Sequence, residues 1–379
     1  MFWSLILKAD RYERKNKMAK QYEIPVGAQH ISLLEPLHFK FTTENERIVS
    51  TTANVYYVHR GIEKACCTKF KFRQVSFVVG RVCGLCSISH TTAYSQVAEK
   101  LIKSEIPSRA KYLRMLVIEL DRIHSHLLCL SHVAENSGFE ALFMKTMQYR
   151  EAFMELLEAL CGNRVQYDFS IVGGVARDLK PEVGLMILER VRNFKPQLDE
   201  LVDIFQNNWT LGLKNKKAGA ISREDAIRLN VVGPFARAAG LAVDVRNESQ
   251  ELLPWKEVGF RIVTETGGDA YSRNLVRLRE IYVSMRMIEN IINGLPESSL
   301  ITETKTFPDG EAVVRIEAPR GELFYYAKGN KTQILERLKI KAPTFSNVSA
   351  MVEAFEGNEY GSVPAIIASY DPCLSCTSR

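Results

Sequence analysis

Two C-x-x-C pairs constrain the fold of this chain more than any other feature of its sequence. Cys83 and Cys86 lie in RVCGLCSISH, and Cys373 and Cys376 lie in DPCLSCTSR. Four thiolates form a site suited to soft metals such as zinc, nickel or an iron–sulfur cluster. The pairs are 290 residues apart (373 minus 83), whereas structural zinc sites usually join their pairs over about 12–20 residues. This separation favours a site that performs chemistry, with structural zinc as the alternative.

The other cysteines and the length of the chain exclude a disulfide scaffold. Eight cysteines in 379 residues are too few for one, so the two pairs indicate metal binding in a reducing compartment. A redox disulfide is disfavoured because no thioredoxin-like βαβ pattern surrounds either pair. The remaining cysteines follow no pattern and are expected to be buried or unreactive thiols: Cys66, Cys67, Cys129 and Cys161.

The composition is that of an ordinary globular chain. Of its residues, 46% are hydrophobic and 25% are charged, which allows one large domain or two to three smaller ones. Lys and Arg outnumber Asp and Glu by 50 to 44, and no basic run contains interleaved aromatic residues, so nucleic-acid binding is not expected. No apolar stretch approaches the ~18–20 residues of a membrane-spanning helix. The opening MFWSLILKADRYERK lacks the basic start and the cleavage site of a secretory signal.

The hydrophobic pattern predicts a mainly α-helical protein with smaller β elements. Residues 38–59 alternate apolar and polar side chains and predict two strands joined by a turn at residues 43–46. Gly162 is expected to end one helix, and Pro196 to kink or split another. The helical period predicts helices over residues 91–103, 108–136, 139–161, 181–208 and 272–293.

The end of the chain returns to β structure. Residues 312–329 predict a β-hairpin with its turn at residues 319–321. Because the sequence contains no repeat and no low-complexity linker, we expect a single domain over residues 23–379, preceded by an N-terminal extension over residues 1–22. Within the domain we expect a β region (23–62), a helical bundle (63–300) and an α/β region with the second cysteine pair (301–379).

Short motifs from about Ile24 to the end carry a family resemblance. In chain order they are IPVGAQHISLLEP, YYVHRGIE, RVCGLCSISH, GGVARDL, VVGPFARAAG, GDAYSRN, EAPRGE and DPCLSC. Together they resemble the large, catalytic subunit of NiFe-hydrogenases, in particular the membrane-bound, energy-converting branch (group 4). That branch is similar to the quinone-site subunit of respiratory NADH–quinone oxidoreductase. The resemblance implies the hydrogenase large-subunit fold, a helix bundle with an N-terminal β-sheet and a β-hairpin near the C-terminus.

The resemblance also implies a metal centre and a reaction. Cys83 and Cys373 would be terminal nickel ligands, and Cys86 and Cys376 would bridge nickel to an iron that carries two cyanides and one carbon monoxide. The reaction is the reversible combination of two protons and two electrons to H2. Because hydrogen is split heterolytically, the site needs a base, and the Cys376 thiolate is the expected first base.

Four further residues match positions of the family's site. Glu35 in LLEP matches the proton-transfer glutamate, and Arg320 in EAPRGE matches an arginine that overhangs the metals. His90 lies four residues after Cys86, on one face of a helical turn, and the resemblance implies a hydrogen bond from it toward a bridging sulfur. Glu63 in RGIE matches a glutamate that binds magnesium or iron in some relatives.

The sequence departs from the family pattern at two places. Relatives with the Glu63 ion site end in a histidine, whereas this sequence ends in Arg379, so a salt bridge is an equal alternative there. His30 in GAQHISLLEP lacks the proline that usually follows it. The remaining histidines of one long helix, with a neighbouring aspartate, are expected to pack or hydrogen-bond within the bundle rather than bind metal: Asp121, His124, His126 and His132.

The resemblance implies partners that supply what this chain lacks. We expect a hydrogenase small subunit with a 4Fe–4S cluster, a ferredoxin-like electron donor, integral-membrane ion-translocating subunits, and a peripheral position on the cytoplasmic side of the membrane. Family members lose a C-terminal extension after nickel insertion, and Arg379 resembles such a processed end, unless the gene stops there. The alternatives are a nickel-free relative that acts on a quinone or a sulfur compound, which usually lacks some of the four cysteines, and a structural-zinc scaffold subunit.

Overall fold

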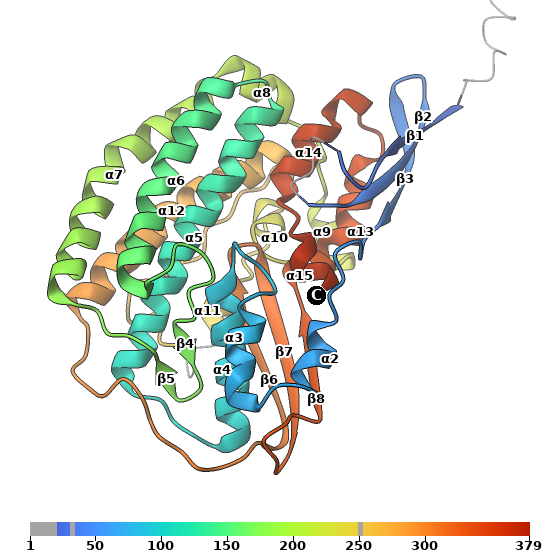
Figure 1. Cartoon of the computed structure of the whole chain (residues 1–379). Helices are drawn as coiled ribbons and strands as arrows, with labels where there is room; N and C mark the ends of the chain where they lie inside the picture. The colour runs from blue at the N-terminus through green and yellow to red at the C-terminus, as the bar shows by residue number, and fades with distance from the viewer. Residues whose placement is uncertain (1–20, 31–34, 249–252) are drawn as a thin grey trace, which may run out of the picture.

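The computed structural model describes residues 21–30, 35–248 and 253–379 (Figure 1). The predicted N-terminal extension therefore lies outside the described residues, except for Gln21 and Tyr22, which begin the first strand. The longer helices are α3 (Phe72–Val79), α4 (Ser87–Ile102), α5 (Ser108–Asn136), α6 (Glu140–Cys161), α7 (Pro181–Asn207), α12 (Ala270–Asn293), α13 (Pro343–Phe355) and α14 (Val363–Tyr370). The shorter ones are α2 (Ile62–Cys66), α8 (Trp209–Asn215), α9 (Arg223–Arg228), α10 (Pro234–Ala238), α11 (Val245–Glu248), α15 (Leu374–Ser378) and the 3-10 turn η1 (Tyr360–Ser362).

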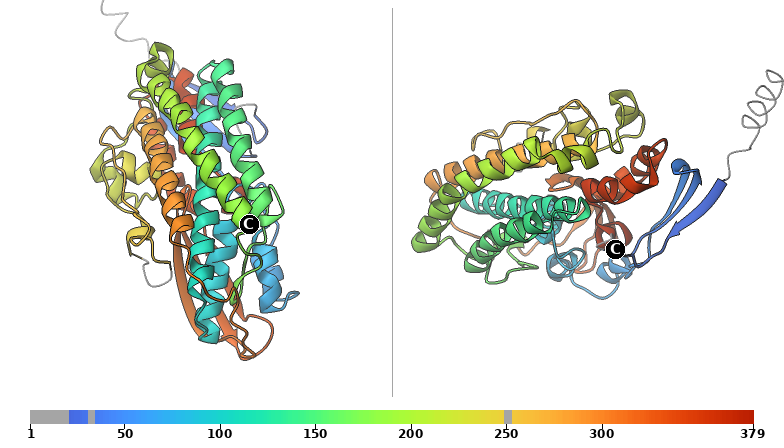
Figure 2. Two further views of the ribbon diagram at one scale, coloured as in Figure 1. Left: turned by 90° about the vertical axis from the view of Figure 1, so that its left-hand side faces the viewer. Right: turned by 90° about the horizontal axis from the view of Figure 1, so that it is seen from above.

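The long helices α5, α6, α7 and α12 lie side by side and form the main body of the molecule (Figures 1 and 2). On α5, Leu116, Ile123 and Leu130 recur every two turns and are fully buried, so one apolar stripe runs along the helix toward its neighbours. They belong to a single apolar core that also includes Ile187 of α7 and Leu278 of α12. The predicted mainly helical fold is confirmed.

The predicted helices agree with the structure except at one proline. Gly162 follows α6 in a left-handed conformation, with φ of 84°, and ends that helix as expected. The expected split at Pro196 is wrong, because α7 continues through it. Pro196 and Arg192, whose carbonyl would otherwise accept its hydrogen bond, both lie on the exposed face of the helix, so water can replace the missing bond.

The N-terminal strands pack against the C-terminal part of the chain. Strands β1 (Gln21–Val26), β2 (His38–Glu44) and β3 (Arg47–Asn54) form one antiparallel sheet, with the expected tight turn between β2 and β3. Phe39 and Phe41 of β2 meet Phe355 of α13, with ring centroids 5.2 and 5.1 Å apart in edge-to-face geometry. Residues from opposite ends of the sequence therefore share one apolar core.

The predicted hairpin near the C-terminus is confirmed and forms part of a larger sheet. Strands β6 (Asp309–Ala318) and β7 (Gly321–Asn330) pair through a turn that pairs Ala318 with Gly321. A third strand, β8 (Arg337–Lys341), was not predicted and extends the sheet. A side chain at Gly321 would meet the backbone nitrogen of Gly233 at 2.8 Å, and its φ is 127°, so glycine is needed for the close approach. Elsewhere β4 (Ser170–Ile171) and β5 (Gly174–Val175) form a small hairpin.

A buried arginine joins the helical body to this sheet. Arg237 of α10 lies 2.6 Å from Glu280 of α12, 2.8 Å from Glu317 of β6 and 3.1 Å from Asp244, and its side chain is fully buried. Burial opposes its charge, but the three carboxylates outweigh burial and raise the pKa of Arg237. If one partner of such a buried ion-pair network is removed, the remaining buried charges are left uncompensated, which is strongly destabilising.

Replacing Arg237 should therefore destabilise the protein strongly. We expect Arg237→Met to lower the free energy of unfolding by about 3–5 kcal/mol, because the buried Glu317 loses its ion pair and two further buried carboxylates each lose one of their partners. Arg228→Met is the matched control: Arg228 also contacts two carboxylates, but its side chain is 55% exposed, and we expect a loss of about 0–1 kcal/mol. Equilibrium urea unfolding measures both, and equal effects would contradict the structural role assigned to Arg237.

Candidate metal centre

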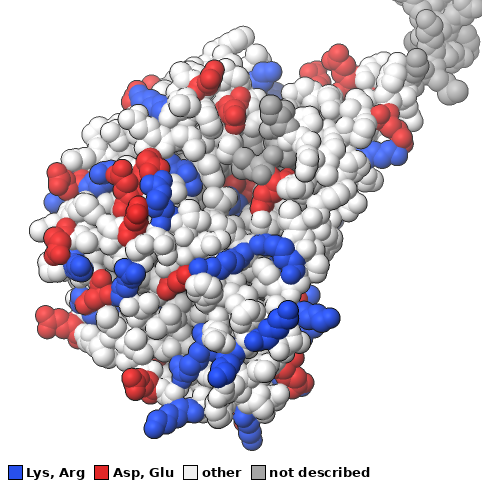
Figure 3. Space-filling view, viewed as in Figure 1, with Lys and Arg blue, Asp and Glu red and all other residues white. Residues whose placement is uncertain are grey.

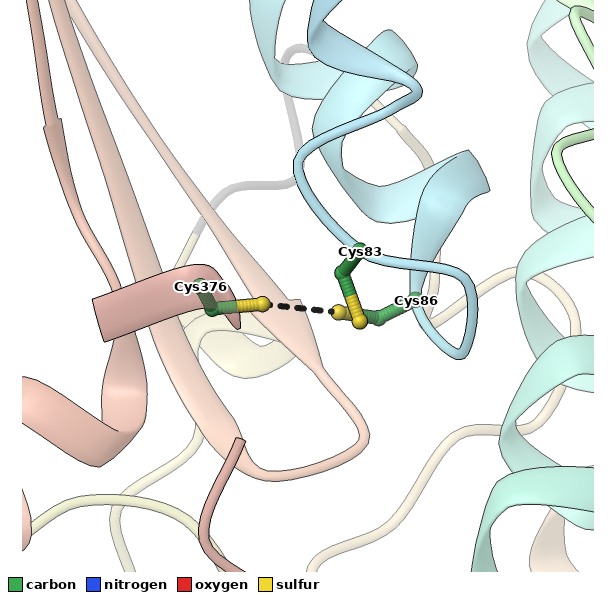
Figure 4. Close-up of side chains that lie close together, drawn as sticks. All are labelled: Cys83, Cys86 and Cys376. Carbon is green, nitrogen blue, oxygen red and sulfur yellow. Dashed lines mark hydrogen bonds between the residues drawn. The ribbon is translucent and has the colours of Figure 1, made fainter. Parts of the chain in front are cut away.

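The two cysteine pairs lie on short turns that face each other. Cys83 and Cys86 lie between α3 and α4, and Cys86 is the residue directly before α4. Cys373 directly precedes α15, and Cys376 lies within it. In Figure 4, Cys376 points from α15 toward the turn that carries Cys83 and Cys86. The fold thus brings together residues that are separated by most of the chain.

The four sulfur atoms form one buried cluster. The sulfurs of Cys83 and Cys373 lie 3.3 Å apart, those of Cys86 and Cys376 3.5 Å apart, and those of Cys373 and Cys376 3.1 Å apart. All four are free thiols and at most 4% exposed. These distances exceed the roughly 2.05 Å of a disulfide and are slightly shorter than the ~3.8 Å between thiolates that share a tetrahedral ion at about 2.3 Å. The sulfurs of Cys83, Cys86 and Cys376 all lie within 4.8 Å of one another, and thiolates of this kind suit a soft metal.

The four thiols influence one another's ionisation. Hydrogen bonds from the neighbouring thiols, led by Cys373, lower the pKa of Cys83. Hydrogen bonding with Cys373 raises the pKa of Cys86, and burial raises the pKa of Cys376. One thiolate can form among the four, but further negative charges repel each other in a dry environment. Ionising all four requires a bound metal.

His90 contacts the cluster from the first turn of α4. Its Nε2 lies 3.3 Å from the Cys376 sulfur and its Nδ1 lies 2.7 Å from the hydroxyl of Tyr325 on β7. Burial lowers the pKa of His90 to about 4, so the ring is neutral at physiological pH. With the Tyr325 hydroxyl donating to Nδ1, the Nε2–H group donates to the sulfur. The contact is made to Cys376, across the site, although the sequence placed His90 and Cys86 on one helical face.

Arg320 is held over the cluster by an aspartate from the second cysteine segment. Its guanidinium donates to the Asp371 carboxylate at 2.7 Å, to the Asp371 carbonyl at 2.9 Å and to the Ser125 hydroxyl at 3.2 Å. Burial opposes its charge, but Asp371 and the neighbouring thiolates outweigh burial and raise the pKa of Arg320. The turn between β6 and β7 therefore places a permanent cation near the sulfurs.

Glu35 contacts the turn between the cysteines of the second pair. Its carboxylate accepts hydrogen bonds from the backbone N–H groups of Leu374 and Ser375, the latter at 3.0 Å, and from the Ser375 hydroxyl. The side chain is half-buried. The predicted carboxylate thus lies beside the cluster without contacting a sulfur atom.

Glu63 forms the salt bridge that the sequence left as an alternative to an ion site. Its carboxylate accepts from the Ile340 backbone N–H at 2.9 Å and from Arg379 at 3.0 Å, and Lys339 lies 3.6 Å away. Burial raises the pKa of Glu63, but these donors and cations outweigh burial and lower it. Because side-chain cations already neutralise the carboxylate, we propose no magnesium or iron at this position.

The residues excluded as ligands make contacts within the helical body. His124 lies 3.2 Å from Asp121, His126 lies 2.8 Å from Glu280, and His132 lies 2.9 Å from Glu135. This agrees with the sequence expectation. His30 lies in the described segment after β1, and it is exposed.

Two polar residues of the site were missed by the sequence analysis. Tyr325 is one of many aromatic residues in a strand, and no local pattern marks its bond to His90. Asp371 stands before Pro372 in DPCLSC, and its place beside the second cysteine pair is the signal that could have identified it. Tyr325 contacts His90 and Asp371 contacts Arg320, and each partner is distant in the sequence.

A cavity of about 1000 Å³ opens beside α15 and carries many cations. It lies between α2 and the β6–β8 sheet, and Figure 3 shows Lys and Arg side chains gathered over this part of the surface. The cations that line it are Lys64, Arg315, Arg337, Lys339, Lys341 and Arg379. These cations, together with Glu63, Glu322 and Glu336, form the basic surface beside α15. Among the described residues, no helix is both long and apolar enough to cross a membrane.

Comparison with known protein families agrees with the fold, and the hydrogenase family matches only the part of the chain that holds the first cysteine pair. The family of the 49 Kd subunit of respiratory-chain NADH dehydrogenase matches residues 136–307 and 299–379, and the nickel-dependent hydrogenase family matches residues 60–136. The nickel-dependent hydrogenase match covers the first cysteine pair. The chain therefore belongs to the oxidoreductase family that joins hydrogenase large subunits with the 49 Kd subunits of respiratory complexes.

The individual relatives include both hydrogenases and an NADH-quinone oxidoreductase subunit. The chain is 36% identical to the membrane-bound hydrogenase subunit alpha of Pyrococcus furiosus, over 94% of this chain and 87% of that protein. It is 35% identical to the carbon monoxide-induced hydrogenase of Rhodospirillum rubrum, over 94% and 99%. It is 30% identical to an NADH-quinone oxidoreductase subunit of Chloroherpeton thalassium, over 96% and 88%.

A solved structure shares the whole fold. A chain of the membrane-bound sulfane sulfur reductase, described as an archaeal respiratory membrane complex, superposes with a TM-score of 0.90 at 27% identity, covering 96% of this chain and all of that chain. The fold expected from the resemblance is confirmed, and it is shared by proteins whose names give different activities.

The contact between Tyr325 and His90 can be tested by removing one hydroxyl. We expect Tyr325→Phe to lower the free energy of unfolding by about 1–3 kcal/mol, because the buried Nδ1 of His90 loses its partner. Tyr326→Phe is the matched control on the opposite face of the same strand, and we expect a change of about 0.5 kcal/mol or less. Denaturant unfolding measures both, and equal losses would contradict the assigned hydrogen bond.

Proposed function

We propose that this protein is the catalytic subunit of an energy-converting NiFe-hydrogenase, which interconverts two protons and two electrons with H2. The observation that supports this most directly is the buried cluster of four free thiols from both C-x-x-C pairs. The match of the nickel-dependent hydrogenase family over the first pair supports the same conclusion.

The four cysteines would hold the metals in the roles implied by the family. Cys83 and Cys373 would bind nickel, and Cys86 and Cys376 would bridge it to an iron carrying cyanide and carbon monoxide. When bound, this centre supplies the two-electron chemistry of hydrogen. The surrounding residues exclude water, since all four sulfurs are buried.

The nearby polar residues would handle charge and protons. The thiolate of Cys376 can accept a proton, and the N–H group of His90 orients and stabilises that sulfur through its 3.3 Å contact. Arg320 supplies a fixed cation that stabilises negative charge developing at the site. Glu35 would take the proton onward, because its carboxylate contacts the turn between Cys373 and Cys376.

We propose that partner subunits supply the electrons and the membrane coupling. Clusters of the 4Fe–4S type need four cysteines, and the other four here are dispersed along the sequence. A small subunit with such a cluster would therefore pass electrons from a ferredoxin-like donor. The relative named as a membrane-bound hydrogenase subunit supports a place in a membrane complex. We propose ion-translocating membrane partners and a peripheral position on the cytoplasmic side. The basic surface beside α15 fits an acidic partner.

A second candidate is reduction of a sulfur compound or a quinone without nickel. The observation that favours it is the fold shared over the whole chain with a sulfane sulfur reductase. A structural zinc site is the third possibility, since four thiolates also suit zinc. The presence of all four cysteines in one cluster favours the hydrogenase.

Metal analysis and infrared spectroscopy of the intact complex, purified without oxygen, distinguish the three. A hydrogenase contains nickel together with iron, and its bound carbon monoxide and cyanide absorb in a region free of protein bands. Zinc alone would support the scaffold. If the mature complex contains neither nickel nor these infrared bands, the hydrogenase proposal is wrong.

Replacing one cluster cysteine should remove both metal and activity. We expect Cys376→Ser to abolish hydrogen evolution and to reduce bound nickel at least about tenfold, because a hydroxyl is a poor ligand for soft metals. Cys129→Ser is the control: it changes a buried free thiol that donates to the Ala368 carbonyl and is not one of the four cysteines of the cluster. Nickel content by mass spectrometry and hydrogen evolution should stay near wild type in the control.

Replacing Glu35 should separate proton transfer from metal binding. We expect Glu35→Gln to keep the nickel, because an amide oxygen can still accept from the Leu374 and Ser375 N–H groups. Its hydrogen turnover should fall by about 100-fold or more, the usual scale for a lost acid–base group. Turnover and hydrogen–deuterium exchange of the gas measure this effect, with the exposed Glu23→Gln as control. Full turnover in Glu35→Gln would rule out the assigned role.

A further inference from the structure

Arg60 bonds to both cysteine-bearing segments at once. Its guanidinium donates to the carbonyls of Arg81 and Val82 at 2.8 Å each and to the carbonyl of Ser375 at 2.9 Å. Val82 directly precedes Cys83, and Ser375 directly precedes Cys376. One side chain therefore connects the backbone of the first pair with that of the second.

His59 adds a bond to the same segment. Its Nδ1 lies 2.5 Å from the carbonyl of Ser378, the last residue of α15, so the ring donates its proton to that oxygen. The last carbonyls of any helix lack partners within the helix, and α15 spans only Leu374–Ser378. His59 and Arg60 thus satisfy carbonyls of α15 that would otherwise remain unpaired.

The planar shape of the Arg60 side chain suits this connection. Its Nε also donates to the Val58 carbonyl at 3.2 Å, so contacts at several nitrogens fix its orientation. A guanidinium presents its donors in a rigid fork, whereas a lysine offers one compact ammonium. A surface arginine without such contacts would be mobile and solvated. Here the carbonyls it bonds lie next to two of the cluster cysteines.

We propose that Arg60, assisted by His59, positions the second cysteine pair against the first and so sets the spacing of the four sulfurs. Arg60 touches no sulfur and acts through the backbone, so it is a positioning residue. Its consequence for the metals rests on the proposed function. Its consequence for the packing of α15 rests on the hydrogen bonds alone.

Variants of Arg60 in the intact complex test this role. We expect Arg60→Ala to speed amide hydrogen exchange of the peptide over residues 374–378 by about tenfold or more, because local opening becomes easier. Bound nickel should fall, and the infrared bands of any remaining metal should shift, since the sulfur spacing changes. Arg60→Lys should restore part of the protection, and the global unfolding midpoint should stay close to wild type in all variants.

Arg73→Ala is the matched control. Arg73 is also an exposed arginine that donates to a backbone carbonyl, that of Thr304 at 2.5 Å, but it contacts neither cysteine segment. Exchange over residues 374–378 and the infrared bands should remain those of the wild type. Equal exchange in Arg60→Ala and Arg73→Ala would overturn the proposal.

The outcome for Arg60 can be separated from the outcome for the proposed function. If the wild-type complex contains no nickel, the hydrogenase proposal fails, but the exchange comparison still tests the positioning role. If Arg60→Ala does not fold, His59→Ala replaces it: this variant removes only the bond to Ser378, and faster exchange over residues 374–378 is again expected. Unchanged exchange in that variant would then overturn the proposal.

Discussion

The whole structure depends on bringing two cysteine pairs, 290 positions apart, to within 3.5 Å of each other. The entropic free-energy cost of closing a loop rises only slowly with its length, by about 0.6 kcal/mol for each doubling. The demanding requirement is therefore the precise placement of the four sulfurs, and not the length of chain between them. Side chains of the described residues supply that precision without a metal. Glu35 accepts hydrogen bonds from the first residues of α15, and Arg60 connects the backbone of α15 to the first pair. The aromatic contacts of Phe355 hold α13 against the N-terminal sheet.

The second constraint is that buried charges need partners of opposite charge. It applies both to the carboxylates around Arg237 and to the cysteine cluster. Around Arg237 a buried cation meets the carboxylates of Glu280, Glu317 and Asp244, so that every charge has a partner within the protein. At the cysteine cluster Arg320 supplies a cation whose carboxylate partner is Asp371, and the guanidinium of Arg60 bonds to the carbonyls directly before Cys83 and Cys376. The first network is complete without a ligand. The cluster holds four sulfurs against a cation that is already paired, so its fully ionised form requires metal.

The sequence predicted those features that are encoded locally. The helix over residues 108–136 and the turn at Gly162 follow from apolar periodicity and from the preferences of glycine. Short or irregular elements such as β8 and α10 lack such a signal. The split expected at Pro196 ignored its exposed position, where water replaces the missing bond. The four cysteines were found from their spacing, whereas Tyr325 and Arg60 act across distances in sequence that no local pattern reports.

The shared fold carries little information about the reaction, because proteins named as hydrogenases, quinone oxidoreductase subunits and a sulfur reductase all match this chain. The four cysteine sulfurs carry more information about the reaction than the fold does. Four buried thiols in contact contribute little to stability, since their mutual repulsion opposes ionisation and their hydrogen bonds are weak. With the neutral His90 and the cation of Arg320 beside it, this cluster of thiols is a donor set that fits a soft metal.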